Sequence, residues 1–210
     1  MPSLPENRNC GACGCKTCRE FRGAVAAGEK NPEICPVYRR EAAAGPAAAD
    51  FGAAVFRGTD IVSAPYDFVL TPLPGEPSAR KIILPFRPDL VEQLGIKKGD
   101  IVAGRPTGAG CPVQHILSVI SADKRTGLIT GHVVGPAYAR GNPDVIDLAM
   151  YHMIGFEGIA DHIRRPPQFG VRHPFLPGFC MMHRTHTGIV NMVLEQSCGI
   201  HVRIEGVIIL

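Results

Sequence analysis

The sequence predicts an α+β protein with two domains. A small N-terminal domain of loop and short helices precedes a β-rich mixed domain, with a largely antiparallel or barrel-like sheet. Five of the eight cysteines lie in the first 35 residues, an alanine-rich stretch with Pro46 follows near residues 43–54, and β-branched runs dominate the remainder. We therefore expect one domain at residues 1–45 and another at 50–210.

Four segments carry helix signals. In residues 19–30, Phe21 and Val25 lie four apart on one face, and a glycine ends the segment. The pattern predicts further helices at residues 35–45, 87–100 and 142–163. The last segment is the longest predicted helix. Asn142 and Pro143 stand at its start as a cap and a first helical residue.

The strand signals are short β-branched runs bounded by Gly, Pro or Asp. Strands outnumber helices and lie close together, which favours an antiparallel or barrel-like sheet. The predicted strands are residues 60–70, 81–86, 99–104, 113–120, 127–135 and 201–210.

Composition excludes some functions. The net charge is +3, without a Lys- or Arg-rich run, aromatics are 6% and Trp is absent, so nucleic-acid binding is not expected. The first residues are polar, and no stretch approaches the ~18 apolar residues of a membrane span. We expect a cytoplasmic protein without a membrane span, in which thiols stay reduced and clustered cysteines indicate metal or redox chemistry.

The N-terminal cysteines have the spacing of a [4Fe-4S] cluster site. Three ligands on one loop and a distant fourth are typical of cubane clusters, and soft thiolates select iron–sulfur or zinc. Gly11 and Gly14 allow sharp turns that aim backbone N–H groups at cluster sulfurs, and Pro36 follows the last ligand. The predicted ligands, in a C-x2-C-x4-C-x16-C pattern, are Cys10, Cys13, Cys18 and Cys35.

Other interpretations of these cysteines stay open. "CGAC" and "CKTC" are C-x2-C pairs of the kind that zinc sites use, although only Gly14 separates them. Disulfides are a further alternative. Cys15 is interpreted as a thiol outside the cluster, since three ligands in the loop suffice. The basic residues Arg8, Lys16, Arg19 and Arg22 are either solvated charges or groups that tune the cluster and steer an acidic partner.

Residues 4–37 resemble a known family of small [4Fe-4S] domains. The stretch is similar to the domain of the B subunit of Rnf-type electron-transport complexes, and to that of the corrinoid iron–sulfur subunit of acetyl-CoA decarbonylase/synthase. The shared features are the opening Asn9–Gly14, the Thr17–Cys18 pair, the aromatic Phe21 and the closing Cys35–Pro36. The resemblance implies the same four ligands, with Cys15 at a variable position.

The C-terminal region contains cysteines and histidines without a specific motif. Cys111 and His115 lie four apart, and Cys180, His183 and His186 follow one another in steps of three, a spacing that would share a helix face. Each group is either a second metal, redox or substrate site, or ordinary core. Cys198 is predicted to lie in the core.

Taken together, the sequence favours an electron-transfer subunit over a stand-alone enzyme. It predicts single-electron relay through one cluster to a redox protein partner or a larger enzyme complex in anaerobic metabolism. Four available cysteines would cap every iron, which favours relay over Lewis-acid catalysis. The alternatives are a redox enzyme with a second Cys/His metal or substrate site in the C-terminal domain, and a zinc-stabilised interaction module.

Overall fold

The computed structural model describes residues 11–35, 38 and 56–210. The chain divides into two compact units, residues 1–53 and 54–210, and each is described by itself. The predicted domain boundaries and the alanine-rich connection lie outside the described residues and stay predictions. The same holds for most of the predicted helix 35–45.

The N-terminal unit contains the first predicted helix, α1 (Cys18–Ala26). Thr17 caps it, since its side-chain oxygen accepts a hydrogen bond from the Glu20 backbone N–H at 3.1 Å. Gly28, with a φ of +74°, follows the last turn in the left-handed conformation that stops helices. The one-turn η1 (Pro32–Ile34) comes next and is capped by Asn31. Residues 11–35 therefore confirm the prediction of a loop followed by a short helix.

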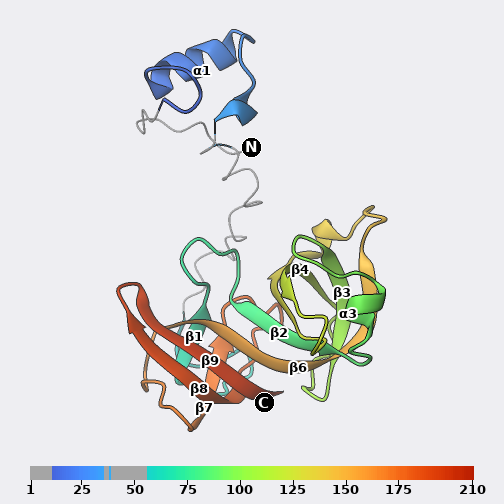
Figure 1. The fold of residues 1–210 in the computed structure, drawn as a ribbon. Coiled ribbons are helices and arrows are strands. Elements are labelled where there is room, and N and C mark those ends of the chain that lie inside the picture. Colours follow the sequence, from blue (N-terminus) through green and yellow to red (C-terminus); the bar gives the residue numbers. More distant parts are fainter. Residues whose placement is uncertain (1–10, 36–37, 39–55) are drawn as a thin grey trace. The chain divides into compact units, whose positions relative to one another are not determined.

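Residues 56–210 form a nine-stranded mixed sheet with two short 3-10 or α-helical turns (Figure 1). The turn α3 lies within the predicted helical segment 87–100, and Gly95 follows it with a φ of +61°. The elements are β1 (Phe68–Thr71), β2 (Arg80–Pro85), α3 (Leu90–Gln93), β3 (Ile101–Thr107), β4 (His115–Ala122), β5 (Ile129–Val134), η2 (Pro136–Tyr138), β6 (Ile146–Asp161), β7 (Arg172–Pro177), β8 (His186–Gln196) and β9 (Gly199–Ile209).

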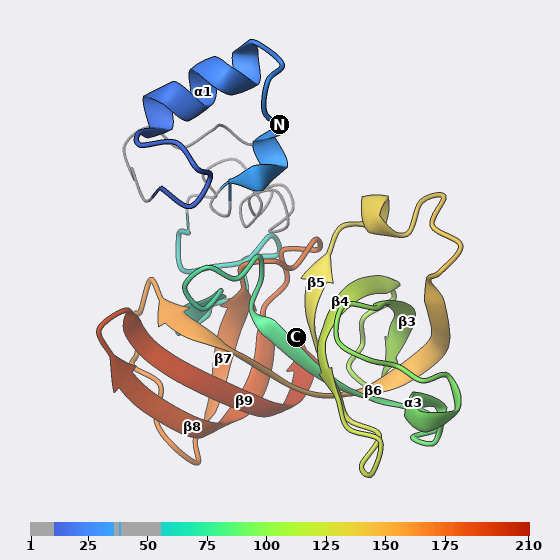
Figure 2. The same cartoon turned by 45° about the horizontal axis from the view of Figure 1, so that its top comes forward.

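The sheet closes on itself twice around its longest strand. The order is β1-β7-β8-β9-β6-β2-β5-β4-β3, and β6 also pairs with both end strands, β1 and β3. The pairings therefore form two five-stranded rings that share β6. Figures 1 and 2 show β6 running from one ring to the other. The predicted barrel-like character is confirmed. Most pairings are antiparallel, whereas β1–β7 and β3–β6 are parallel.

Each ring encloses its own hydrophobic core. Met153, near the middle of β6, packs against both cores and links them. The ring of β1, β7, β8 and β9 buries a cluster that includes Phe68, Phe175, Val202 and Ile204. The ring of β2 to β5 buries one that includes Ile83, Val102, Leu117 and Tyr151.

The predicted long helix at residues 142–163 is wrong, because most of this segment is β6. Bulges shift the β6 register against β3 and β2, and Ala149 takes a φ of +55° at one of them. Buried residues consequently fall at 148, 151, 155, 156, 158, 159 and 160, and the steps of three and four among the first of them resemble a helical spacing. Asn142 starts a turn instead, since its side-chain oxygen accepts from the Asp144 N–H at 3.0 Å.

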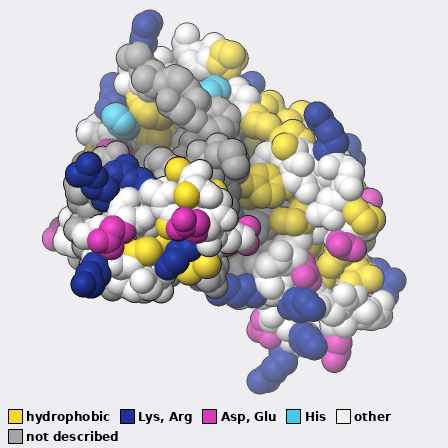
Figure 3. All heavy atoms as spheres, turned by 90° about the horizontal axis from the view of Figure 1, so that it is seen from above, with side chains coloured by type: hydrophobic (Ala, Val, Ile, Leu, Met, Phe, Trp, Pro, Cys, Tyr) yellow, Lys and Arg dark blue, Asp and Glu magenta, His cyan; other side chains and the backbone are white. Residues whose placement is uncertain are grey.

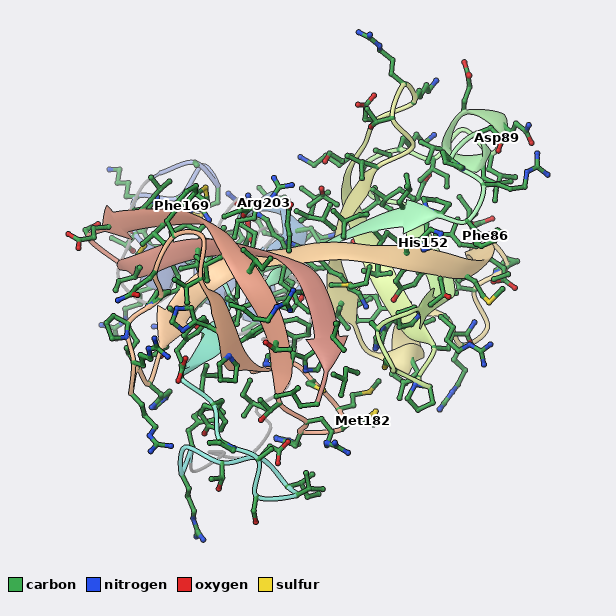
Figure 4. All side chains as sticks on the ribbon, turned by 90° about the horizontal axis from the view of Figure 1, so that it is seen from below. Phe86, Asp89, His152, Phe169, Met182 and Arg203 are labelled. Atoms are coloured by element: carbon green, nitrogen blue, oxygen red, sulfur yellow. The ribbon has the colours of Figure 1, made fainter. Side chains whose placement is uncertain are left out.

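Beyond Pro85 the β2–β6 contact continues through an aromatic pair. Figure 4 shows Phe86 and His152 of β6 next to each other, and their rings stack with centroids 5.5 Å apart. On the face in Figure 3, acidic and basic side chains are interspersed, as the small net charge suggests. Among the described helices, none has the length and apolar character needed to cross a bilayer.

Candidate functional sites

The N-terminal site is a tight loop that leads into α1. Gly11 and Gly14 have φ values of +71° and +76°, and the Gly14 N–H donates to the Gly11 carbonyl at 2.9 Å. Only glycine adopts this conformation readily, so the predicted turning role of both residues is confirmed. The turn carries Cys13, which is half-buried.

The next two predicted ligands come from different elements of the N-terminal unit. Cys18 is the first residue of α1 and Cys35 follows η1, and both are buried. Cys10 lies outside the described residues. Among the residues described, no three His, Cys, Asp or Glu side chains come together as a metal site. None of the seven described cysteines is joined in a disulfide.

Cys15 has a contact that does not require a metal. Lys30, beyond α1, donates to the Cys13 carbonyl oxygen at 3.0 Å and to the Cys15 sulfur at 3.4 Å. The lysine thereby joins the cysteine loop to the segment that follows the helix. A positive charge beside this loop also suits a negatively charged thiolate set.

The donor chemistry of this segment fits an iron–sulfur cluster. Soft sulfur ligands, two of them buried, stand next to a backbone turn whose glycines have positive φ. Burial excludes water from the thiolates, and turned N–H groups favour negative charge. Cys10, Cys13, Cys18 and Cys35 would hold the cluster, which supplies one-electron chemistry when bound.

A second site lies in the C-terminal unit, in a pocket lined by both rings of the sheet. Its volume is about 30 Å³. The lining is mostly apolar, with five polar or thiol side chains, and this composition is typical of small-molecule sites. These side chains are Lys81, Cys111, His115, Cys180 and His186.

Three titratable side chains from three strands meet beside this pocket. Lys81 of β2, His115 of β4 and Tyr151 of β6 form what we call the Lys81 cluster. The lysine Nζ lies 2.5 Å from His115 Nδ1 and 2.6 Å from Tyr151 Oη, and the last two atoms are 2.8 Å apart. Lys81 is 1% exposed and lies 4.9 Å from the Tyr151 ring centre.

Burial sets the charges of this cluster. Burial lowers the pKa of Lys81 to about 7. The nearby Cys111 and Cys180 thiols have the opposite, smaller effect and raise this pKa. Burial, reinforced by Lys81 and His186, lowers the pKa of His115 to about 3. It raises the pKa of Tyr151 above its ordinary value. At neutral pH the imidazole and the phenol are therefore uncharged, and the lysine is divided between amine and ammonium.

The hydrogen bonds assign the proton positions around His115. A protonated Lys81 can only donate, so in that form it donates to Nδ1 and the neutral ring carries its hydrogen on Nε2. Nε2 lies 3.8 Å from the Cys111 sulfur, so this N–H points at the thiol. Across the pocket, burial lowers the pKa of His186 to about 4, and its Nδ1 lies 2.8 Å from the Arg184 carbonyl oxygen.

The structure brings together four of the five C-terminal candidates. Cys111, His115, Cys180 and His186 line one pocket although they come from distant segments. His183 does not line the pocket. It closes a turn, with its N–H donating to the Cys180 carbonyl at 3.0 Å. The three residues at steps of three lie on a turn and a strand start, so the helix-face interpretation of their spacing is wrong.

The sequence analysis differs from the structure at Cys198 and at two residues of the Lys81 cluster. Cys198 is exposed in the turn between β8 and β9, so its predicted core position is wrong. Lys81 and Tyr151 were not predicted as site residues. A lysine at the start of the apolar run "KIILPF" was the available signal for Lys81. Tyr151 gives no comparable signal, because the pattern of its segment predicts a helix and not a strand that reaches Lys81.

Fold and site define the class of this protein: an iron–sulfur cluster domain is followed by a ring-closed β-sheet domain. Residues 4–37 match the family profile described as "Putative Fe-S cluster". The chain is 31% identical over 210 residues to "Uncharacterized protein MJ0119" of Methanocaldococcus jannaschii, covering 95% of this chain and 87% of the relative. The chain belongs to the same family as that protein. No solved structure matches it.

Proposed function

We propose that this protein transfers electrons one at a time through a single [4Fe-4S] cluster held by Cys10, Cys13, Cys18 and Cys35. The observation that carries the proposal is the match of residues 4–37 to an iron–sulfur cluster domain, over three suitably spaced cysteines in one loop and a fourth at Cys35. Four thiolates leave no iron open to substrate, which favours relay over catalysis at the metal.

The residues of the N-terminal unit support this role in distinct ways. Burial of Cys18 and Cys35 keeps two sulfurs away from water, and Lys30 fixes the loop by its bond to the Cys13 carbonyl. The exposed side chains of Lys16 and Arg19 offer positive charge for an acidic redox protein or a larger enzyme complex. We place this partnership in the cytoplasm, where the thiols stay reduced.

Cysteine substitutions test the ligand assignment. After anaerobic purification, Cys13→Ser, Cys18→Ser or Cys35→Ser should each lower iron and sulfide by at least about tenfold, because each removes a thiolate ligand. Cys15→Ser is the matched control in the same loop and should retain the cluster. Loss of iron in Cys15→Ser, with retention in Cys35→Ser, would overturn the assignment. Zinc in place of iron and sulfide would support the zinc-stabilised module.

A second candidate function is a redox enzyme with a substrate site in the C-terminal unit. The Lys81 cluster and its pocket favour it, because perturbed titratable groups beside a cavity are typical of catalytic sites. The lysine nitrogen lies 2.5 Å from His115 Nδ1, and among the described residues no three His, Cys, Asp or Glu side chains come together as a metal site. The arrangement favours a substrate over a second metal.

A further inference from the structure

We propose that Lys81 is an amine nucleophile that forms an imine with a small aldehyde or ketone bound in the C-terminal pocket. The inference deepens the second candidate function, on which it rests, by naming the class of substrate. It does not depend on the cluster, since every residue involved belongs to residues 56–210.

The surroundings of Lys81 are those of a neutral amine. Its hydrogen-bond partners are the His115 ring and the Tyr151 hydroxyl, both uncharged, and in the described region of the chain no carboxylate pairs with it. A buried ammonium without a carboxylate is costly, so burial favours the unprotonated form. The resulting pKa of about 7 leaves a large fraction of nucleophilic amine at neutral pH.

The two neighbours of Lys81 supply the proton transfers that imine formation needs. The Nζ lone pair attacks the carbonyl carbon, forming the C–N bond while the C=O π electrons move to oxygen. His115 Nδ1 and the Tyr151 hydroxyl, which lie 2.5 and 2.6 Å from the nitrogen, pass its two protons in turn to the oxygen. The first transfer gives a carbinolamine. The second lets the C–O bond break, so that the oxygen leaves as water while the nitrogen lone pair forms the C=N bond. The products are an imine and one water molecule, so the step requires neither oxidant nor reductant.

The cavity restricts the carbonyl compound to a small and weakly polar one. A volume of about 30 Å³ has room for only a few heavy atoms beside the amine. Phe156, Phe179 and Val207 line the wall and favour a short alkyl group. Cys111 and Cys180 also face the cavity, and their thiols add reversibly to the same carbonyls.

Reductive trapping distinguishes the amine from the thiols. The full chain is incubated at pH 7 with acetaldehyde and sodium cyanoborohydride, which reduces an imine to a stable ethylamine but leaves a thiol adduct reversible. Peptide mass spectrometry should find ethyl groups on Lys81 at least about tenfold sooner than on the exposed Lys97 and Lys98, because exposed lysine amines are almost fully protonated at this pH. Ethylation of the exposed lysines alone, in folded protein, would overturn the proposal.

Two variants separate a chemical role from a structural one. Tyr151→Phe keeps the ring and should slow Lys81 ethylation by about tenfold or more, because it removes the hydroxyl proton donor. Lys97→Arg is the surface control and should leave the rate at Lys81 unchanged. An unchanged rate in Tyr151→Phe would refute the role given to that hydroxyl.

Iron content is measured on the same samples, so the two proposals fail separately. Absence of Lys81 ethylation with iron and sulfide present removes the imine site and leaves electron transfer standing. Ethylation of Lys81 in protein that binds no iron supports the imine site and removes the relay.

Discussion

Lys81 shows how one buried residue constrains the chemistry around it. Its amine is surrounded by the Tyr151 and Phe156 rings and by neutral hydrogen-bond partners. Replacing it with an apolar residue of similar length would remove a desolvated nitrogen that opposes folding whenever it is charged. Lys81 therefore lowers the stability of the sheet when it is charged. A functional site explains why such a residue is present there.

The pH dependence of stability tests the state of Lys81. Its folded pKa is about 7 and its ordinary value is 10.5, so between these values the unfolded chain binds more protons. The free energy of unfolding should therefore rise as pH increases from 7 towards 10, by an amount on the order of a few kcal/mol. Urea titrations followed by circular dichroism at pH 7, 8 and 9 measure it.

Lys81→Met should abolish most of that rise, whereas the exposed Lys97→Met should preserve it. Below pH 6.5 both forms should lose stability as His115 and His186, with folded pKa values of about 3 and 4, bind protons in the unfolded chain. A rise between pH 7 and 9 that survives in Lys81→Met would contradict the assignment of a lowered pKa.

At the scale of elements, β6 decides the architecture of the C-terminal unit. It pairs with four strands, β1, β2, β3 and β9, and so belongs to both rings. Its glycines permit these approaches, since a Cβ on Gly155 would lie within van der Waals overlap of the Ile204 carbonyl oxygen and one on Gly158 of the Thr71 carbonyl oxygen. The same strand places Tyr151 in contact with Lys81 and His115 beside the pocket.

Gly158→Ala should destabilise the C-terminal unit by about 2–4 kcal/mol, because the new methyl group meets backbone that cannot move without disrupting β1. Gly135→Ala is the matched control, since a Cβ there meets nothing within 4 Å. It should change the free energy of unfolding by less than about 0.5 kcal/mol. Urea unfolding of both variants makes the comparison, and equal stabilities would disprove the role given to the β1–β6 contact.

At the scale of the whole molecule, the two units differ in what stabilises them. Residues 54–210 contain two hydrophobic cores joined through Met153, whereas the buried residues of α1 are Cys18 and Phe21. The described residues of the N-terminal unit bury little apolar surface, and small domains of this kind commonly rely on a bound metal for stability. The C-terminal unit has no such need.

A fragment of residues 50–210 should therefore melt cooperatively without the cluster. Its melting temperature should equal that of the same unit in the full chain after the iron is removed by oxidation. Scanning calorimetry of both samples makes the comparison. A broad, non-cooperative transition in the fragment would mean that the units fold as one.

The N-terminal cysteine pattern, helix α1 and the β-rich character of the remainder could all be predicted from the amino-acid order alone. These features depend on local spacing: ligands in one short loop, a Thr cap and a Gly stop, and β-branched runs between turns. The path of β6 required the three-dimensional structure, because bulges gave a strand the periodicity of a helix. So did the pocket, since Lys81 lies 34 residues from His115 and 70 from Tyr151. The pairing of strands that are distant in the sequence, which local spacing does not specify, brings these side chains together.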